Sequence, residues 1–179
     1  DGEAFLLQPG IGVGGHCTPV YPYFLINNFK EAGLDFDLAS RSRVINDGMA
    51  EHAVSLAIPH VHEKNALILG LSFRPNIKED TFSTSYLLNE ALLSHGFRVQ
   101  LHDTEFSAEE LARKGFTACA DVYASGAEVL FLVTMHKEYA SLDFKRLAAS
   151  GVKVIIDGRN QLNSNTIEDA GMRYIGIGR

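Results

Sequence analysis

The sequence predicts an α/β fold in which a helical segment is followed by a doubly wound parallel sheet. From Ala66 onward, short apolar runs alternate with helical ones, and the connections between them are short. This alternation places successive strands parallel in one sheet. Residues 23–60 show helical periodicity alone, and the polar stretch PHVHEKN closes that part. We therefore expect a first part at residues 1–62 and a second at residues 63–179.

The composition excludes several classes of partner. The 179 residues are 46% hydrophobic and carry a net charge of −6 without a basic run, which disfavours nucleic acid and anionic membranes. No apolar stretch reaches the length of a membrane span, and we find no leader. Cys17 and Cys119 make no disulfide framework, so we expect a reduced cytoplasmic protein. His60 and His62, two residues apart, indicate a solvated terminus and no metal site.

The first element is a glycine-rich loop, PGIGVGGHCTPVYPY, in which Gly10, Gly12 and Gly15 spell G-x-G-x-x-G. A dinucleotide-binding turn needs a strand before it and a helix at its last glycine. The nine preceding residues are too few for such a strand, and Pro19 and Pro22 discourage an immediate helix. We expect instead a loop that presents a thiol and whose N–H groups suit an anion or an oxyanion.

Two helices follow, one ending at Gly33 and a longer one opened by Asp35 or Asp37. The longer helix has an apolar face that must pack on something else, such as another subunit. Its members are Leu38, Val44, Ile45, Met49, Ala53, Val54 and Leu56.

The second part contains strands at 66–73, 98–103, 129–134 and 153–158, with helices at 83–96 and 107–115 and a further segment at 137–151. Ligands of such sheets bind at the carboxyl ends of the strands. Arg74 and Arg159 follow two of these strands, where a guanidinium suits phosphate or a base, although ordinary surface arginines remain the alternative. We interpret His102 and His136 as structural. The remaining residues at these ends are Ser72, Phe73, Asp103, Thr134, Met135, Asp157 and Gly158.

Four ordered motifs, PGIGVGGHCTPVYPYFL, SRVIND, LILGLSFRPN and VIIDGRN, resemble the C-terminal half of the UDP-glucose and GDP-mannose dehydrogenase family. The resemblance covers essentially the whole chain. The GGHC form is most similar to members acting on UDP-N-acetylhexosamines such as UDP-N-acetyl-D-mannosamine.

The resemblance implies an NAD-binding Rossmann domain first, then a helical dimerisation segment and a Rossmann-like UDP-binding domain. This sequence would begin after the first of these. We therefore expect a homodimeric fragment that lacks the NAD site and does not turn over alone.

The family oxidises the C6 alcohol of a UDP-sugar to a carboxylate with two NAD molecules. Cys17 matches its nucleophile, whose thiolate forms a thiohemiacetal and then a thioester. Substrate contacts are implied for Gly12, Gly14, Gly15 and His16 on the loop, for Phe73, Arg74 and Arg159 after the strands, and for Arg41 or Arg43 toward the neighbouring subunit.

This sequence departs from the family pattern at two places. Tyr21 stands where the family usually has an aspartate associated with the hydrolytic water, and a neutral phenol cannot act as a carboxylate base. Thr81, Phe82 and Ser83 replace an Arg-Glu-Ser triplet, so sugar contacts there are in doubt. Two other classes stay open. One is a non-catalytic nucleotide-sugar-binding module; the other is a thiol hydrolase using His16 and Cys17, disfavoured because adjacent residues rarely face one another.

Overall fold

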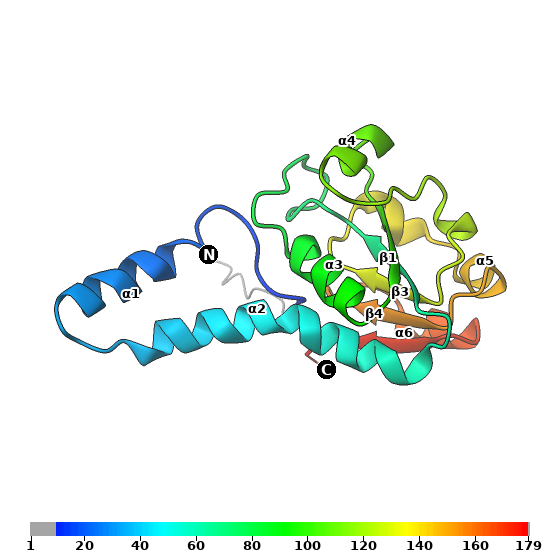
Figure 1. Ribbon diagram of the computed structural model, residues 1–179. Coiled ribbons are helices and arrows are strands. Elements are labelled where there is room, and N and C mark those ends of the chain that lie inside the picture. The colour runs from blue at the N-terminus through cyan, green and yellow to red at the C-terminus, as the bar shows by residue number, and fades with distance from the viewer. Residues whose placement is uncertain (1–9, 179) are drawn as a thin grey trace, which may run out of the picture.

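The computed structural model describes residues 10–178, and within them a single parallel sheet forms the centre of the molecule (Figure 1). Its strand order, β2-β1-β3-β4-β5, confirms the doubly wound fold. The strands are β1 (Asn65–Leu69), β2 (Arg98–His102), β3 (Val129–Leu132), β4 (Val154–Asp157) and β5 (Arg173–Gly176).

Helices cover both faces of the sheet. The α-helices are α1 (Tyr21–Glu31), α2 (Asp37–Ala57), α3 (Thr84–Ser94), α4 (Ala108–Arg113), α5 (Phe144–Ala149) and α6 (Ser164–Asp169), and the 3-10 turns are η1 (Ile58–His60), η2 (Val122–Ala124) and η3 (Lys137–Ser141). Side chains of α2, α3 and α4 share one core with Ile68 and Phe131, whereas those of α5 and α6 share another with Leu67 and Leu130. Successive residues of β1 and β3 thus point to opposite faces, which explains their unbroken apolar runs.

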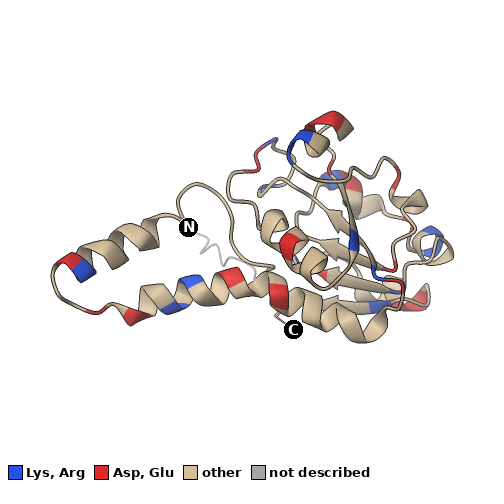
Figure 2. Cartoon of the chain, in the orientation of Figure 1, with Lys and Arg blue, Asp and Glu red and all other residues tan. Residues whose placement is uncertain are grey.

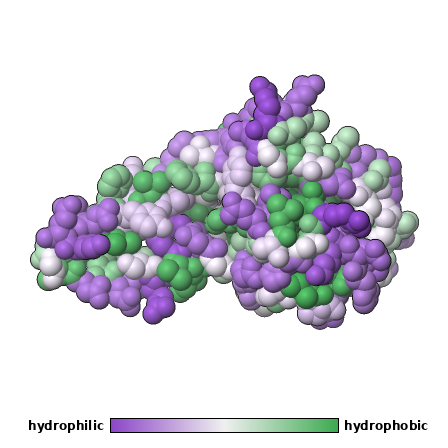
Figure 3. Space-filling view, viewed as in Figure 1, coloured by the Kyte–Doolittle hydropathy of each residue, from purple (hydrophilic) through white to green (hydrophobic). Residues whose placement is uncertain are grey.

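Helices α1 and α2 form a hairpin that projects from the body of the molecule (Figure 1). The predicted apolar face of α2 is divided between two environments. Ala53 and Val54 are buried in the core beside α3, but Leu38 is 73% exposed and Ile45 is 60% exposed on the projecting half. Apolar and polar patches alternate on the hairpin surface (Figure 3). The projecting half therefore leaves apolar side chains without cover from its own chain.

Several boundaries differ from the sequence-based expectation. Helix α1 begins at Tyr21 with Pro22 in its first turn, where a missing N–H costs nothing because that group lacks an intrahelical partner. Strand β1 ends at Leu69, since Gly70 takes a φ of +96°. Helix α6 and strand β5 were not predicted; both are short, and Gly176 interrupts the apolar pattern of β5.

Candidate functional site

The glycine loop, residues 10–17, crosses the carboxyl end of the sheet and starts beside Arg159. A Cβ on Gly10 would lie 2.8 Å from the Gly158 carbonyl oxygen and 3.3 Å from Arg159 Nη1. Only a residue without a side chain allows this approach. The loop backbone and the Arg159 guanidinium consequently share one surface at the end of β4.

The same loop then packs against the segment that follows β1. A Cβ on Gly15 would lie 2.8 Å from Phe73 Cε2, and one on Gly14 would lie 2.7 Å from the Phe82 carbonyl oxygen. The Gly15 N–H donates to the Thr81 carbonyl at 3.0 Å. The structure therefore brings the predicted Gly14, Gly15 and Phe73 into direct contact.

Helix α2 fixes the middle of the loop through Asn46. The Asn46 Oδ1 accepts a hydrogen bond from the Val13 N–H at 2.8 Å. Gly12 has a φ of +81°, and a Cβ there would lie 3.1 Å from the Asn46 carbonyl oxygen. Asn46 is a loop anchor that we did not predict, although it stood within the SRVIND motif.

His16 and Arg74 flank the Phe73 ring. The His16 Nε2 contacts Glu79 Oε1, and its ring meets that of Phe73 edge to face with centroids 6.2 Å apart. The Arg74 guanidinium carbon lies 5.1 Å from the Phe73 centroid, in cation–π range. Two groups able to carry positive charge thus lie around one aromatic ring next to the loop amides.

Cys17, at the end of the loop, is exposed and lines a groove of about 510 Å3 with Tyr21, Leu25, Phe36 and Leu38. The turn into α1 brings Tyr21 back toward it, since the Tyr21 N–H donates to the Cys17 carbonyl at 2.9 Å. A side-chain hydrogen bond with Cys17, reinforced by its charge, raises the pKa of Tyr21. The phenol therefore keeps its proton and donates to the sulfur.

Asp157 holds the segment that carries Arg159. This fully buried carboxylate accepts hydrogen bonds from the N–H groups of Arg159 at 2.8 Å, Gln161 at 2.9 Å and Leu162 at 2.8 Å. The Tyr174 hydroxyl donates to it at 3.0 Å. The conformation after β4 is thus set by one acidic side chain, a role that its position after an apolar strand did not reveal.

The two predicted arginines of α2 differ in their surroundings, and Arg43 lines a cavity together with the loop residue Val13 and with Asn46. Arg41 is exposed, whereas Arg43 is buried and paired with Asp47 at 2.6 Å. Arg43 also lies 5.9 Å from the Tyr23 ring centroid and lines a second cavity of about 600 Å3. Its Nε has no hydrogen-bond partner among the described residues.

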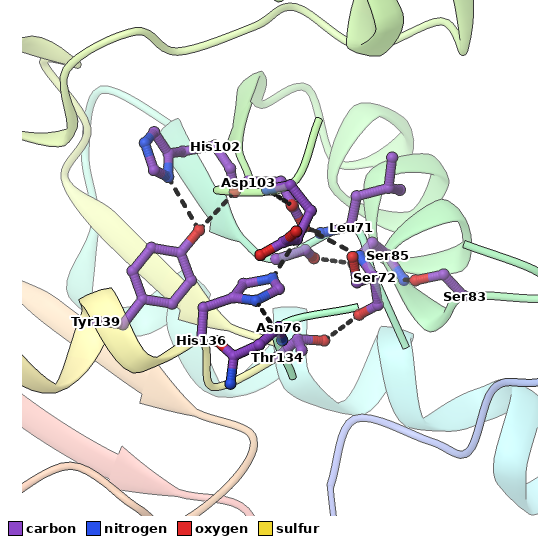
Figure 4. Close-up of polar contacts among 12 residues, drawn as sticks. Leu71, Ser72, Asn76, Ser83, Ser85, His102, Asp103, Thr134, His136 and Tyr139 are labelled. Atoms are coloured by element: carbon purple, nitrogen blue, oxygen red, sulfur yellow. Dashed lines mark hydrogen bonds and ion pairs between the residues drawn. The ribbon is translucent and has the colours of Figure 1, made fainter. Parts of the chain in front are cut away.

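His102 and His136 belong to a polar cluster with Asp103 and Tyr139 (Figure 4). His136 is fully buried. Burial is the main cause that lowers the pKa of His102. Both histidines bond within the protein, as a structural role requires.

Within residues 10–178, the G-x-G-x-x-G sequence of the glycine loop does not have the geometry of an NAD-binding turn. The loop lies on Asn46, Phe73 and Gly158, and a turn at residues 18–20 separates it from α1. Neither the strand-to-helix context nor the helix N-terminus at the last glycine is present in this part of the chain. The described residues also contain no cluster of three or more histidine, cysteine, aspartate or glutamate side chains placed to hold a metal.

The described residues include no helix long and apolar enough to cross a membrane. Acidic and basic side chains are interspersed over the sheet domain and along α2, while α1 is uncharged until its end (Figure 2).

Two family models match the chain. The UDP-binding domain of the UDP-glucose/GDP-mannose dehydrogenase family matches residues 67–164, and the central domain of the same family matches residues 2–48. The first match alone covers more than half of the sequence.

Individual relatives agree with this assignment. The chain is 30% identical to a UDP-N-acetyl-D-mannosamine dehydrogenase of Pyrococcus horikoshii, over 96% of this chain and 40% of the relative. It is 31% identical to a UDP-glucose 6-dehydrogenase of Pseudomonas aeruginosa, over 97% of this chain and 41% of the relative. The chain thus spans about 40% of the length of these proteins.

Solved structures show the same fold. The crystal structure of an NDP-N-acetyl-D-galactosaminuronic acid dehydrogenase from Methanosarcina mazei matches with a TM-score of 0.81 at 25% identity, covering 97% of this chain and 40% of that one. A UDP-D-ManNAc dehydrogenase from Pyrococcus horikoshii matches with a TM-score of 0.76 at 27% identity, covering 96% and 40%. This chain therefore belongs to the UDP-glucose/GDP-mannose dehydrogenase family and corresponds to its C-terminal part.

Proposed function

We propose that this chain is the substrate-binding part of an NAD-dependent UDP-sugar 6-dehydrogenase that oxidises a UDP-N-acetylhexosamine, namely UDP-N-acetyl-D-mannosamine, to its uronate. The observation that carries the proposal is the path of the glycine loop, which leads from Arg159 past Phe73 to the exposed Cys17. A nucleotide bound at the start of the loop would direct its sugar toward the thiol.

The diphosphate would be held by charge and by backbone donors. Arg159 lies beside Gly10, where the glycine loop begins. Arg74 lies beside the Phe73 ring, which packs against Gly15 farther along the loop. Guanidinium groups bind phosphate oxygens in a bidentate manner, and glycine-rich backbone offers N–H groups at close range. Phe73 supplies an aromatic face beside them. This combination suits a nucleoside diphosphate better than a neutral sugar.

Cys17 would act as the nucleophile on the C6 aldehyde. Its thiolate adds to the carbonyl carbon, and the resulting oxyanion takes up a proton to give a thiohemiacetal. NAD, when bound, accepts the hydride lost in each oxidation. Water then cleaves the resulting thioester and returns the thiol. Tyr21, which shares a side-chain hydrogen bond with Cys17, would lie beside the reacting sulfur.

NAD would bind to a part of the full-length enzyme outside this sequence, because the described residues do not fit it and the matched relatives are about two and a half times as long. His16, beside Cys17 and the Phe73 ring, is the residue that we assign to recognition of the N-acetylated sugar. The proposal does not require nucleic acid, a membrane or a resident metal.

The hairpin would form a homodimer. Its exposed apolar residues gather on one projecting element, which would bury them against a second copy through an isologous contact. They are Tyr21, Tyr23, Phe24, Leu25, Leu34, Leu38, Val44 and Ile45.

Calorimetric titration with UDP and with UDP-N-acetyl-D-mannosamine tests the nucleotide pocket. We expect saturable binding that Arg159→Ala weakens roughly ten- to hundredfold, the effect of one charged hydrogen-bonding contact. Arg98→Ala is the matched control, because Arg98 is exposed at the opposite, amino end of the sheet. Equal losses in both variants, or a folded parent that does not bind, would overturn the assignment.

A non-catalytic nucleotide-sugar-binding module is the second candidate, and Tyr21 in place of a carboxylate favours it. The two differ in the thiol chemistry, which this chain can reveal without NAD. The C6 aldehyde of the UDP-sugar should protect Cys17 from iodoacetamide far better than the parent alcohol if Cys17 is the nucleophile. A binding module would give equal protection by both compounds.

A further inference from the structure

The crevice that doubly wound sheets usually offer to a ligand is closed in this chain. It lies between β1 and β3, where the strand order reverses. A Cβ on Gly70 would be 2.6 Å from Thr134 Cβ, and the Thr134 hydroxyl donates to the Ser72 carbonyl. The segments that follow the two strands therefore touch each other.

The Asp103 carboxylate, which directly follows β2, lies next to Ser72 at this contact (Figure 4). Its Oδ2 accepts hydrogen bonds from the Leu71 N–H at 2.6 Å and the Ser72 N–H at 3.0 Å. Its Oδ1 accepts from the Glu105 N–H at 2.7 Å. Asp103 thus holds the first two residues of the segment that leads to Phe73.

His136 joins this carboxylate to the far end of the same segment. The ring Nδ1 accepts the Asn76 N–H at 2.9 Å, so the ring proton lies on Nε2, which is 3.1 Å from Asp103 Oδ2. Both side chains are fully buried. One imidazole therefore ties Asn76 to the carboxylate that holds Leu71 and Ser72.

Asn76 is shaped for this contact. Its φ of +57° is a left-handed conformation that asparagine tolerates better than most residues, and its Oδ1 accepts the Lys137 N–H at 2.9 Å. Asn76 thus makes two bonds to the segment after β3, in addition to the bond between Thr134 and Ser72. Phe73 and Arg74 lie between the two fixed points.

The charges support an ionised carboxylate in this cluster. Burial opposes the ionisation of Asp103, but hydrogen bonds from His136 and from backbone N–H groups outweigh it and lower its pKa to about 2. Burial, followed by the charge of Asp103, raises the pKa of Tyr139. The Tyr139 hydroxyl donates to the His102 carbonyl at 3.0 Å, which covers the outer side of the cluster.

We propose that Asp103 and His136 are positioning residues that fill the crevice between β1 and β3 and fix residues 71–76, so that Phe73 and Arg74 face the glycine loop and Arg159. The inference rests on the proposed function for the identity of the ligand, a UDP-sugar. Its structural part, the clamp on residues 71–76, stands on the contacts alone. The nucleotide consequently binds toward β4 and not in the crevice.

Two substitutions of one residue separate the two contacts. The Oδ1 of His136→Asn can replace Nδ1 as acceptor for the Asn76 N–H, but the shorter side chain withdraws the donor from Asp103. The Nε2 of His136→Gln can replace the imidazole donor, but it leaves the Asn76 N–H without an acceptor. Asp103→Asn removes the charge while keeping the size.

The measurements are amide hydrogen exchange, resolved by NMR, and UDP titration by calorimetry on this chain. We expect His136→Gln to speed exchange at Asn76, His136→Asn to spare that amide, and Asp103→Asn to speed exchange at Leu71 and Ser72. Variants that release the segment should bind UDP roughly ten- to hundredfold more weakly. Leu147→Ala is the control, because Leu147 is buried in the core on the other face of the sheet. It should lower global stability without a selective effect on residues 71–76.

The outcomes separate this inference from the proposed function. If the folded parent binds neither UDP nor the UDP-sugar, the proposed nucleotide ligand is wrong. The exchange data would still decide whether Asp103 and His136 hold residues 71–76. Unchanged exchange at residues 71–76 in all three variants, or losses no more selective than in Leu147→Ala, would overturn the clamp. Selective release without weaker UDP binding would overturn the positioning role.

Discussion

Asp157→Asn should destabilise the fold more than its small change in shape suggests. The carboxylate accepts four hydrogen bonds, one through Oδ1 from the Arg159 N–H and three through Oδ2. An amide has one oxygen, so in either orientation its NH2 group faces at least one buried donor. The substitution therefore weakens the bonds that remain and leaves a backbone N–H without an acceptor.

The expected loss is about 3 kcal/mol in the free energy of unfolding. A stranded buried donor costs about 1–3 kcal/mol, and replacing a charged acceptor by a neutral one costs about 1 kcal/mol per bond. The smaller desolvation penalty of an amide offsets part of this sum. Binding of UDP should also weaken, since the Arg159 N–H is one of the four donors.

Urea unfolding followed by far-UV circular dichroism measures this loss. Asp143→Asn is the matched control, because Asp143 caps α5 at an exposed site and asparagine caps a helix about as well as aspartate. The control should stay within about 0.5 kcal/mol of the parent. A loss below about 1 kcal/mol for Asp157→Asn would refute the view that this carboxylate fixes the segment after β4.

Four further predictions concern the loop, the thiol, the hairpin and acid stability. Gly15→Ala should destabilise by about 2–3 kcal/mol in urea unfolding, because it adds a collision with Phe73 to the cost of a positive φ. Cys17→Ala should lower the pKa of Tyr21 toward its ordinary value, measured by NMR titration of the Tyr21 ring, since the hydrogen bond with Cys17 that raises this pKa is lost. Ile45→Glu should shift the chain to monomer in sedimentation equilibrium. Because the pKa of Asp103 is lowered to about 2 in the fold, its contribution of about 2 kcal/mol is present above pH 4 and is lost between about pH 4 and 2, which urea titrations at several pH values would show.

Each of these predictions has a matched control. Gly33→Ala shares the positive φ but meets no atom within 4 Å, so an equal loss would exclude the collision with Phe73. Cys119→Ala removes the other free cysteine, so it should leave the pKa of Tyr21 unchanged, and an equal change in both variants would argue against the bond to Cys17. Leu93→Glu alters an exposed leucine outside the hairpin, and a dimer lost in both variants would argue against the hairpin. A loss of stability between about pH 4 and 2 that is as large in Asp103→Asn as in the parent would refute the assignment to that carboxylate.

The fold was predictable where one periodicity extends over several turns or a whole buried strand. The runs around β1 and β3 are apolar on both faces, and helix α2 is long enough to show its period. Helix α6 and strand β5 are too short for a periodic signal. Pairing with β4 determines the structure of β5, and α6 packs against β5 and α5. The expectation that Pro22 would discourage an immediate helix was wrong, because a proline disrupts a helix interior but is tolerated in the first turn, where it lies in α1.

The candidate site residues were predicted from the family resemblance, but the residues that support them were not. Cys17, Arg159 and Phe73 were named because their motifs match the family, since an arginine after a strand is usually a surface charge and a cysteine is often a small buried filler. Asn46 and Asp157 were not, since an asparagine on a helix or an aspartate after a strand is usually solvated. The role of Asn46 depends on a bond from Val13, distant in the sequence, whereas that of Asp157 depends on how the backbone N–H groups just after it turn back toward its carboxylate.

The two supporting aspartates suggest why this surface and not the switch-point crevice would hold a ligand. Asp103 holds the segment after β1 from a neighbouring strand, and Asp157 holds the segment after its own strand. Both are saturated with donors of the protein, so neither carboxylate faces an incoming diphosphate with free acceptor oxygens. The guanidinium groups of Arg74 and Arg159, in contrast, extend from these fixed segments on long side chains. A surface built this way presents positive charge on an ordered backbone, and binding an anion there would order side chains without reorganising the segments that carry them.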